Sequence, residues 1–128
     1  MKFIYLILLT VVLMFSGCGG SNLCITQEID RRPSPDDLVE AVLLKSDCGA
    51  TTDYSYRVYI VPVGGEPTEK HLIFLADKVE KINVSWLDQR ELKIAYDNAR
   101  IFQFRNFSQP LEAEGVEYAI SISDTEKN

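Results

Sequence analysis

A period of two in the apolar side chains runs along most of this chain, and it restricts the fold more than any other feature. In residues 81–86, KINVSW, every second position from residue 82 is apolar, and residues 91–96 and 116–123 repeat this alternation. Successive side chains of a β-strand point to opposite faces of a sheet, so each of these segments has one face for a core. The alternation therefore predicts strands.

Seven segments alternate in this way or form a short apolar run, and each is a predicted strand. They are residues 38–45, 54–62, 71–76, 81–86, 91–96, 101–107 and 116–123. Their apolar faces predict a buried core made of Val58, Ile60, Ile82, Val84, Trp86, Leu92, Ile94, Tyr96, Val116, Tyr118, Ile120 and Ile122. Short polar connections between the segments favour tight turns. The prediction is an all-β fold, either an antiparallel meander or a small sandwich of about six or seven strands.

One segment has a second interpretation. Residues 34–44, SPDDLVEAVLL, could form a helix that begins at a Ser34 or Asp36 cap. Val39, Val42 and the alternation on either side favour a strand instead.

The amino-terminal residues have the pattern of a secretory signal. Lys2 precedes the uncharged run 3–15, which is shorter than the roughly 20 residues that a membrane-spanning helix needs. Small residues directly before Cys18 resemble the bacterial lipobox, although Phe15 stands where that pattern usually has leucine. The resemblance implies cleavage after residue 17 and lipid attachment to Cys18. The alternative is an ordinary signal peptide that is cut nearby.

The domain organisation follows from these two patterns. Residues 1–17 are the expected signal peptide, and residues 18–35, with their glycines and prolines, the expected lipidated cysteine and tether. Residues 36–124 are the expected β domain, and residues 125–128 a disordered tail. Arg31-Arg32 is the only basic pair in a chain of net charge −6, and we interpret it as part of a solvated loop. An acidic chain without a basic cluster argues against binding to nucleic acid.

Cys24 and Cys48 remain once Cys18 is assigned to lipid. An even pair in an exported chain predicts a disulfide, worth about 3.5 kcal/mol of folding free energy by loop closure. A metal site is not indicated, because there is no Cys-x-x-Cys and His71 is the single histidine. A nucleophilic Cys48 would need a base such as His71. We favour the structural role, in which Gly49 allows a sharp turn beside Cys48.

Several short motifs resemble a small family of bacterial domains of unknown function. They are SPDD at 34–37, Ala41-Val42, DCGATT at 47–52, SYRV at 55–58, Ala76-Asp77, WLDQRELKIAY at 86–96 and ARIF at 99–102. Such domains are often exported or lipid-anchored, so the resemblance implies a compact, mostly β domain and no assigned activity. Asp37 stands where the family usually has glycine, and the segment before Trp86 lacks the glycine-rich insertion of many relatives. The same elements look like single blades of TolB-type propellers.

These observations favour an uncharacterised, non-catalytic lipoprotein of the bacterial cell envelope. Its expected partners are the membrane, through Cys18, and an envelope protein or another envelope component, with no cofactor, metal or nucleic acid. Gly19 rather than aspartate follows Cys18. By resemblance to the sorting pattern of bacteria with two membranes, this residue favours the periplasmic face of the outer membrane.

Two alternatives stay open at this point. The first is a binder of a small ligand or sugar through exposed aromatic residues, the candidates being Tyr54, Tyr56, Tyr59 and Trp86. The second is an enzyme that uses Cys48 and His71. The exposure of the aromatic side chains and the separation of Cys48 from His71 distinguish these alternatives from the lipoprotein hypothesis.

Overall fold

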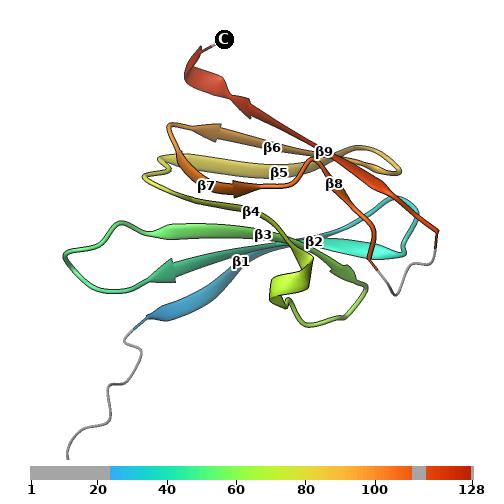
Figure 1. Cartoon of the computed structure of the whole chain (residues 1–128), viewed down its shortest axis with the longest axis horizontal. Coiled ribbons are helices and arrows are strands. Elements are labelled where there is room, and N and C mark those ends of the chain that lie inside the picture. Colours follow the sequence, from blue (N-terminus) through green and yellow to red (C-terminus); the bar gives the residue numbers. More distant parts are fainter. Residues whose placement is uncertain (1–23, 111–114, 128) are drawn as a thin grey trace, which may run out of the picture.

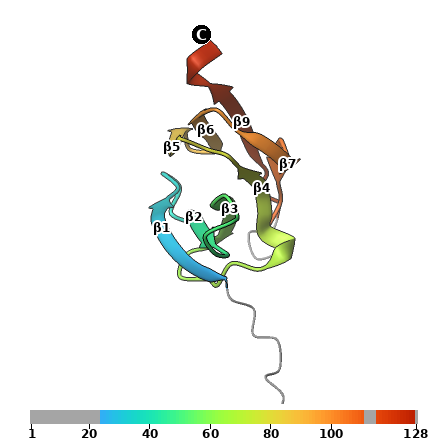
Figure 2. The same cartoon turned by 90° about the vertical axis from the view of Figure 1, so that its left-hand side faces the viewer.

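The computed structural model describes residues 24–110 and 115–127, which form two β-sheets packed face to face (Figures 1 and 2). The elements are β1 (Ile25–Pro33), β2 (Val39–Asp47), β3 (Ser55–Pro62), the 3₁₀ helix η2 (Glu69–His71), β4 (Leu72–Asp77), β5 (Lys81–Asp88), β6 (Glu91–Asp97), β7 (Arg100–Phe104), β8 (Phe107–Ser108), β9 (Tyr118–Asp124) and the 3₁₀ helix η3 (Thr125–Lys127). This architecture confirms the predicted all-β class. The expected signal peptide and Cys18 lie outside the described residues.

The strands divide between a five-stranded sheet and a four-stranded sheet. Sheet A has the order β1-β2-β3-β4-β7, and sheet B has the order β5-β6-β9-β8. Within the described ranges, no helix has the length and apolar character needed to cross a bilayer.

The chain passes from sheet A to sheet B within the segment predicted as one strand over 101–107. β7 pairs with β4 in sheet A, whereas β8 pairs with β9 in sheet B. The change of sheet at Arg105 and Asn106 therefore splits the predicted strand into two. β9 then pairs with β6 in the parallel direction. Sheet B is therefore mixed, whereas the sequence predicted antiparallel pairing throughout.

Strand β1 is the main correction to the predicted organisation, which placed a tether over residues 18–35. Residues 25–33 pair with β2 along their whole length, with one register shift between Glu28 and Asp30. Most of these side chains are exposed, so no apolar face marks the strand in the sequence. The β domain accordingly includes β1. At the other end, Thr125–Lys127 form a 3₁₀ turn where a disordered tail was expected.

The inner faces of the two sheets share one apolar core. Its buried residues are Val39, Ala41, Leu43, Val58, Ile60, Ile73, Phe74, Ala76, Val84, Leu92, Ile94, Tyr118 and Ile120. Seven of the predicted core residues are in this set, and Ile82, Trp86, Tyr96, Val116 and Ile122 pack against it in partly buried positions. Phe74 is fully buried in this core but was not predicted, because the continuous apolar run 71–76 does not show which side chains face inward.

A second, smaller apolar cluster lies on the outer face of sheet A. Val42, Tyr59, Val61 and Leu72 are buried there. The turn after β3 is tied to this face, because the Gly64 amide donates to Glu40 over 3.2 Å. Both faces of β2 and β3 are therefore covered, which explains why these strands carry apolar runs rather than a clean alternation.

Candidate functional site

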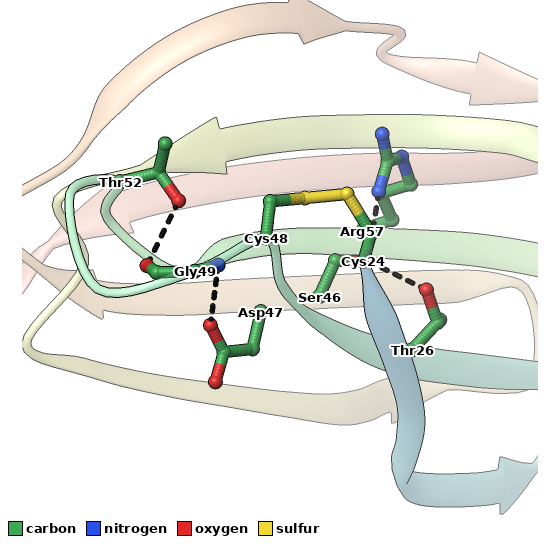
Figure 3. The surroundings of a disulfide bond; sticks show 8 residues. All are labelled: Cys24, Thr26, Ser46, Asp47, Cys48, Gly49, Thr52 and Arg57. Atoms are coloured by element: carbon green, nitrogen blue, oxygen red, sulfur yellow. Dashed lines mark hydrogen bonds between the residues drawn. A yellow bond between two sulfur atoms is a disulfide. The ribbon is translucent and has the colours of Figure 1, made fainter. Parts of the chain in front are cut away.

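A disulfide joins the start of the described chain to the end of β2 (Figure 3). Ile25 pairs with Asp47, so Cys24 and Cys48 lie opposite each other at the next position of the ladder. Their Cα atoms are 3.9 Å apart, and both residues are exposed to solvent. The predicted pairing of Cys24 with Cys48 is confirmed.

The DCGATT stretch forms a hydrogen-bonded turn next to the disulfide (Figure 3). The Gly49 amide donates to the Asp47 carboxylate over 3.0 Å, and the Thr52 hydroxyl donates to the Gly49 carbonyl over 3.2 Å. Gly49 has φ of 123°, a conformation that side chains with a Cβ rarely adopt. These residues therefore have a structural role that accounts for their spacing.

Cross-strand hydrogen bonds below the disulfide join β1, β2 and β3. The hydroxyls of Thr26 and Ser46 are 2.9 Å apart, and Arg57 donates to Ser46 over 3.1 Å (Figure 3). The disulfide thus lies at the end of strands β1 and β2, which side-chain hydrogen bonds also join.

The structure does not bring Cys48 and His71 together. Cys48 lies beyond the pair Ser46–Ser55 at one end of β3, whereas His71 precedes Leu72, which pairs with Tyr59. Four residue steps along β3, from Ser55 to Tyr59, separate these two positions, a distance of about 13 Å. His71 is buried, and its Nδ1 is 2.9 Å from the Thr68 hydroxyl. Among the described residues there is no group of three His, Cys, Asp or Glu placed to hold a metal.

The four aromatic candidates for ligand stacking differ in exposure. Tyr59 is buried, and Tyr56 and Trp86 are partly buried against the core. Tyr54 is 48% exposed, with the Lys45 ammonium 3.8 Å above its ring. It borders a shallow hollow of about 390 Å³, lined by Asp47, Gly49, Ala50, Thr52 and Tyr54. Only Tyr54 therefore remains as a stacking candidate.

A buried tyrosine links sheet B to the SPDD turn, a contact that the sequence did not predict. The Tyr118 hydroxyl donates to Asp36 over 2.8 Å, and the Arg90 guanidinium lies 3.8 Å from the same carboxylate. The Ser34 hydroxyl and the Leu38 amide donate to the other oxygen of Asp36. We call these five residues the Asp36 latch.

The latch shifts the pKa of its two central groups. Burial raises the pKa of Asp36, but the hydrogen bonds from Ser34, Leu38 and Tyr118 outweigh burial and leave the value below 3.8. Burial, together with the bond to Asp36, raises the pKa of Tyr118 to about 12. The sequence offered one local signal, a serine and an aspartate two residues apart ahead of a strand. It contained no sign of the partner on β9.

Replacing Tyr118 with phenylalanine should destabilise the fold by about 1.5–3 kcal/mol, because Asp36 loses a charge-assisted hydrogen bond inside the structure. Urea denaturation of the purified protein measures this change. Tyr54→Phe is the matched control, since that ring is half exposed, and it should change stability by less than about 0.5 kcal/mol. Equal stability of the two variants would show that the latch contributes nothing.

The Asp36 latch should also give the stability a pH dependence. The pKa of Asp36 is lower in the folded protein than its ordinary value of 3.8. The ionised Asp36 therefore contributes fully to the free energy of unfolding above pH 3.8, and this contribution is lost as the pH falls through the lower pKa of the folded state. We expect the stability gap between wild type and Asp36→Asn to narrow over that range. A gap that widens in acid would contradict this assignment.

Arg31 lies in a charged network rather than in the solvated loop that was expected. Its guanidinium is 2.8 Å from Glu28 and 2.6 Å from Glu40, and it donates to the Gly65 carbonyl over 3.3 Å. The hydrogen bond from Arg31 lowers the pKa of Glu40, which is almost fully buried. This network joins β1 to β2 and to the turn after β3 on the outer face of sheet A.

Three further motif residues, Asp77, Trp86 and Arg100, make contacts between strands. Asp77 accepts two hydrogen bonds from Arg100, of 2.9 and 2.6 Å, which join β4 to β7. The Trp86 indole donates to the Arg32 carbonyl over 2.9 Å, and its ring lies 5.8 Å from that of Tyr118. These contacts give Asp77, Trp86 and Arg100 structural roles within the sandwich. Comparison with protein families, curated proteins and solved structures finds no match to this chain, so the family resemblance stays a prediction.

Proposed function

We propose that this chain is a lipid-anchored domain of the bacterial cell envelope that acts by binding rather than by catalysis. The observation that carries the proposal is the solvent-exposed disulfide between Cys24 and Cys48. Exposed disulfides persist in oxidising compartments and are rare in the reducing cytosol. Cys24 follows the lipobox-like Cys18 by only six residues, so both features support export of the same segment.

The distance from Cys18 to Cys24 limits how far the domain stands from the membrane. Six extended residue steps span at most about 20 Å. With acyl chains on Cys18 in the bilayer, the disulfide end of the sandwich would therefore lie close to the lipid surface. Two or more chains hold a protein stably, since each buried methylene contributes about 0.8 kcal/mol.

The surroundings of the candidate catalytic side chains support a binding role rather than catalysis. The Cys48 sulfur is bonded in the disulfide, and the buried His71 precedes Leu72, which pairs with Tyr59 rather than with the end of β3 nearest Cys48. The Asp36 carboxylate is occupied by donors from its own turn and from Tyr118. Among these candidates, none combines an accessible nucleophile with a neighbouring base.

Native alkylation tests the proposal against cysteine chemistry. The unreduced protein, extracted from membranes in mild detergent, is treated with iodoacetamide across a range of pH. We expect recovery in the detergent phase and no label on Cys48 until a reductant is added. Rapid labelling of Cys48 well below pH 8.5, the usual thiol pKa, would show an activated thiolate and contradict the proposal.

Saccharide binding at Tyr54 is a second candidate function. It is favoured by the exposure of this ring beside the hollow that Asp47 and Thr52 line. An aromatic platform with a carboxylate and a hydroxyl nearby suits a sugar ring. Saturation-transfer NMR with N-acetylhexosamine oligomers would test it, with signal expected for wild type and lost in Tyr54→Ala.

A further inference from the structure

Two phenylalanines are exposed where the chain passes from sheet A to sheet B. Phe102 on β7 is 58% exposed and Phe107 on β8 is 45% exposed. The Arg100 guanidinium lies 5.0 Å from the Phe102 ring, and the Arg105 guanidinium lies 5.9 Å from the Phe107 ring. We call these four residues the Phe-Arg patch.

The charge of the Phe-Arg patch is opposite to that of the chain. Residues 98–110 contain two arginines and no aspartate or glutamate, whereas the whole chain has a net charge of −6. Arg100 is paired with Asp77, but no carboxylate among the described residues pairs with Arg105. A cationic and aromatic surface on an acidic protein is complementary to carboxylates on a partner.

Strand β7 also has an open backbone edge. It is the last strand of sheet A, and no described strand pairs with its outer side. The Arg105 amide donates to the Ile73 carbonyl on β4 over 2.8 Å. Because backbone groups alternate in direction along a strand, the N–H and C=O of the neighbouring Phe104 point away from β4. The register shift opposite Leu75 and Ala76 leaves Phe102 as the unpaired extra residue.

We infer that the outer edge of β7 binds an extended, acidic segment of a partner protein as an added strand. The segment's backbone pairs with the open edge near Phe104, its apolar side chains contact Phe102 and Phe107, and its carboxylates pair with Arg105. This inference deepens the proposed binding role and rests on it.

The position of the patch favours a protein segment over the membrane surface. β1, which follows Cys24, and β7 are the two opposite edges of sheet A, as Figure 2 shows. Four strand spacings separate them, about 19 Å. Phe102 therefore lies on the edge of sheet A that is farthest from β1. The hydrocarbon of a bilayer would also offer no hydrogen-bond partners to the open backbone groups of β7.

Three synthetic peptides test the inference on the full-length protein in detergent micelles. The first, Ac-SEVEVES-NH₂, offers alternating carboxylates and valines; the second replaces each glutamate with lysine. The third keeps the glutamates but carries N-methyl groups on alternate amides, which prevents strand pairing. Fluorescence anisotropy of labelled peptides should show saturable binding of the first at least about tenfold tighter than of the other two, and weaker in high salt.

Two double variants place the binding on the patch. Phe102→Ser with Arg105→Glu should weaken binding of the acidic peptide by about tenfold or more. Leu87→Ser with Arg32→Glu changes an equally exposed leucine and an arginine elsewhere, and it should leave the affinity unchanged. Circular dichroism confirms that both variants keep the strand spectrum.

Each remaining outcome counts against the inference. If the lysine peptide bound as tightly as the acidic peptide, charge complementarity would not explain the binding. If the N-methylated peptide bound as tightly, strand addition would not explain it. Binding of the acidic peptide to neither wild type nor variant would overturn the site. If the protein instead bound anionic phosphatidylglycerol vesicles through Phe102 and Arg105, the patch would be a membrane contact. A wild-type protein that stays membrane-bound in these cases leaves the proposed anchoring intact.

Discussion

Replacing Cys18 with serine should abolish lipid attachment, and with it stable recovery of a processed protein in the membrane fraction. Without the thiol no diacylglyceryl group is added, and the signal is not cut before residue 18. The variant should therefore be left as a larger, unprocessed chain, or be released in soluble form where another peptidase cuts the signal at a different bond. Detergent-phase partitioning, read together with the size of the chain, measures both outcomes.

The matched control for Cys18→Ser is the double variant Cys24→Ser with Cys48→Ser. It also removes sulfur atoms from the exported part but should stay processed and in the detergent phase. A Cys18→Ser protein that is still shortened and still partitions into detergent would show that another element anchors the chain.

Removing the disulfide should destabilise the domain by about 3.5 kcal/mol, because the unfolded chain regains the freedom of the loop between Cys24 and Cys48. Replacing both cysteines with serine leaves no free thiol to react. Urea denaturation should show a lower midpoint for the variant, and reduction of the wild type should reproduce the loss. A variant as stable as the oxidised wild type would contradict the staple role of the bond.

Removing the disulfide should loosen the first residues of β1 more than any other part of the domain. The side chains of Ile25 and Ile29 are exposed, so apolar burial contributes little there. Beyond backbone pairing, the disulfide and the hydroxyl pair of Thr26 and Ser46 hold this end against β2. Hydrogen exchange of residues 25–28 should accelerate in the double variant, while exchange of the buried strand β4 reports only the change in global stability.

The sequence predicted most strands well, because one face of each is apolar and alternation reports burial directly. β1 was missed for the same reason, since it is held by pairing, by the disulfide and by Arg31 rather than by an apolar face. The parallel pairing of β9 with β6 could not be read from alternation either. A period of two says which side chains turn inward, but not which strand lies next.

The disulfide could be predicted because it needs only a count of cysteines and an exported setting. The Asp36 latch could not, since Asp36 and Tyr118 are 82 residues apart and both look ordinary in isolation. Tyr118 was predicted as a core residue, but its hydroxyl partner depends on how β9 enters sheet B. The Phe-Arg patch could not be predicted either, because the exposure of Phe102 depends on the register shift and the edge position of β7.

One intact-mass measurement tests the central claim that this is an exported, lipid-anchored and disulfide-stapled domain. The protein is extracted from membranes without reductant, blocked with iodoacetamide and analysed by mass spectrometry. We predict a chain that begins at Cys18, carries a diacylglyceryl and an acyl group, and has no label on Cys24 or Cys48. A chain that still contains residues 1–17, lacks lipid and is labelled on these cysteines would contradict the account.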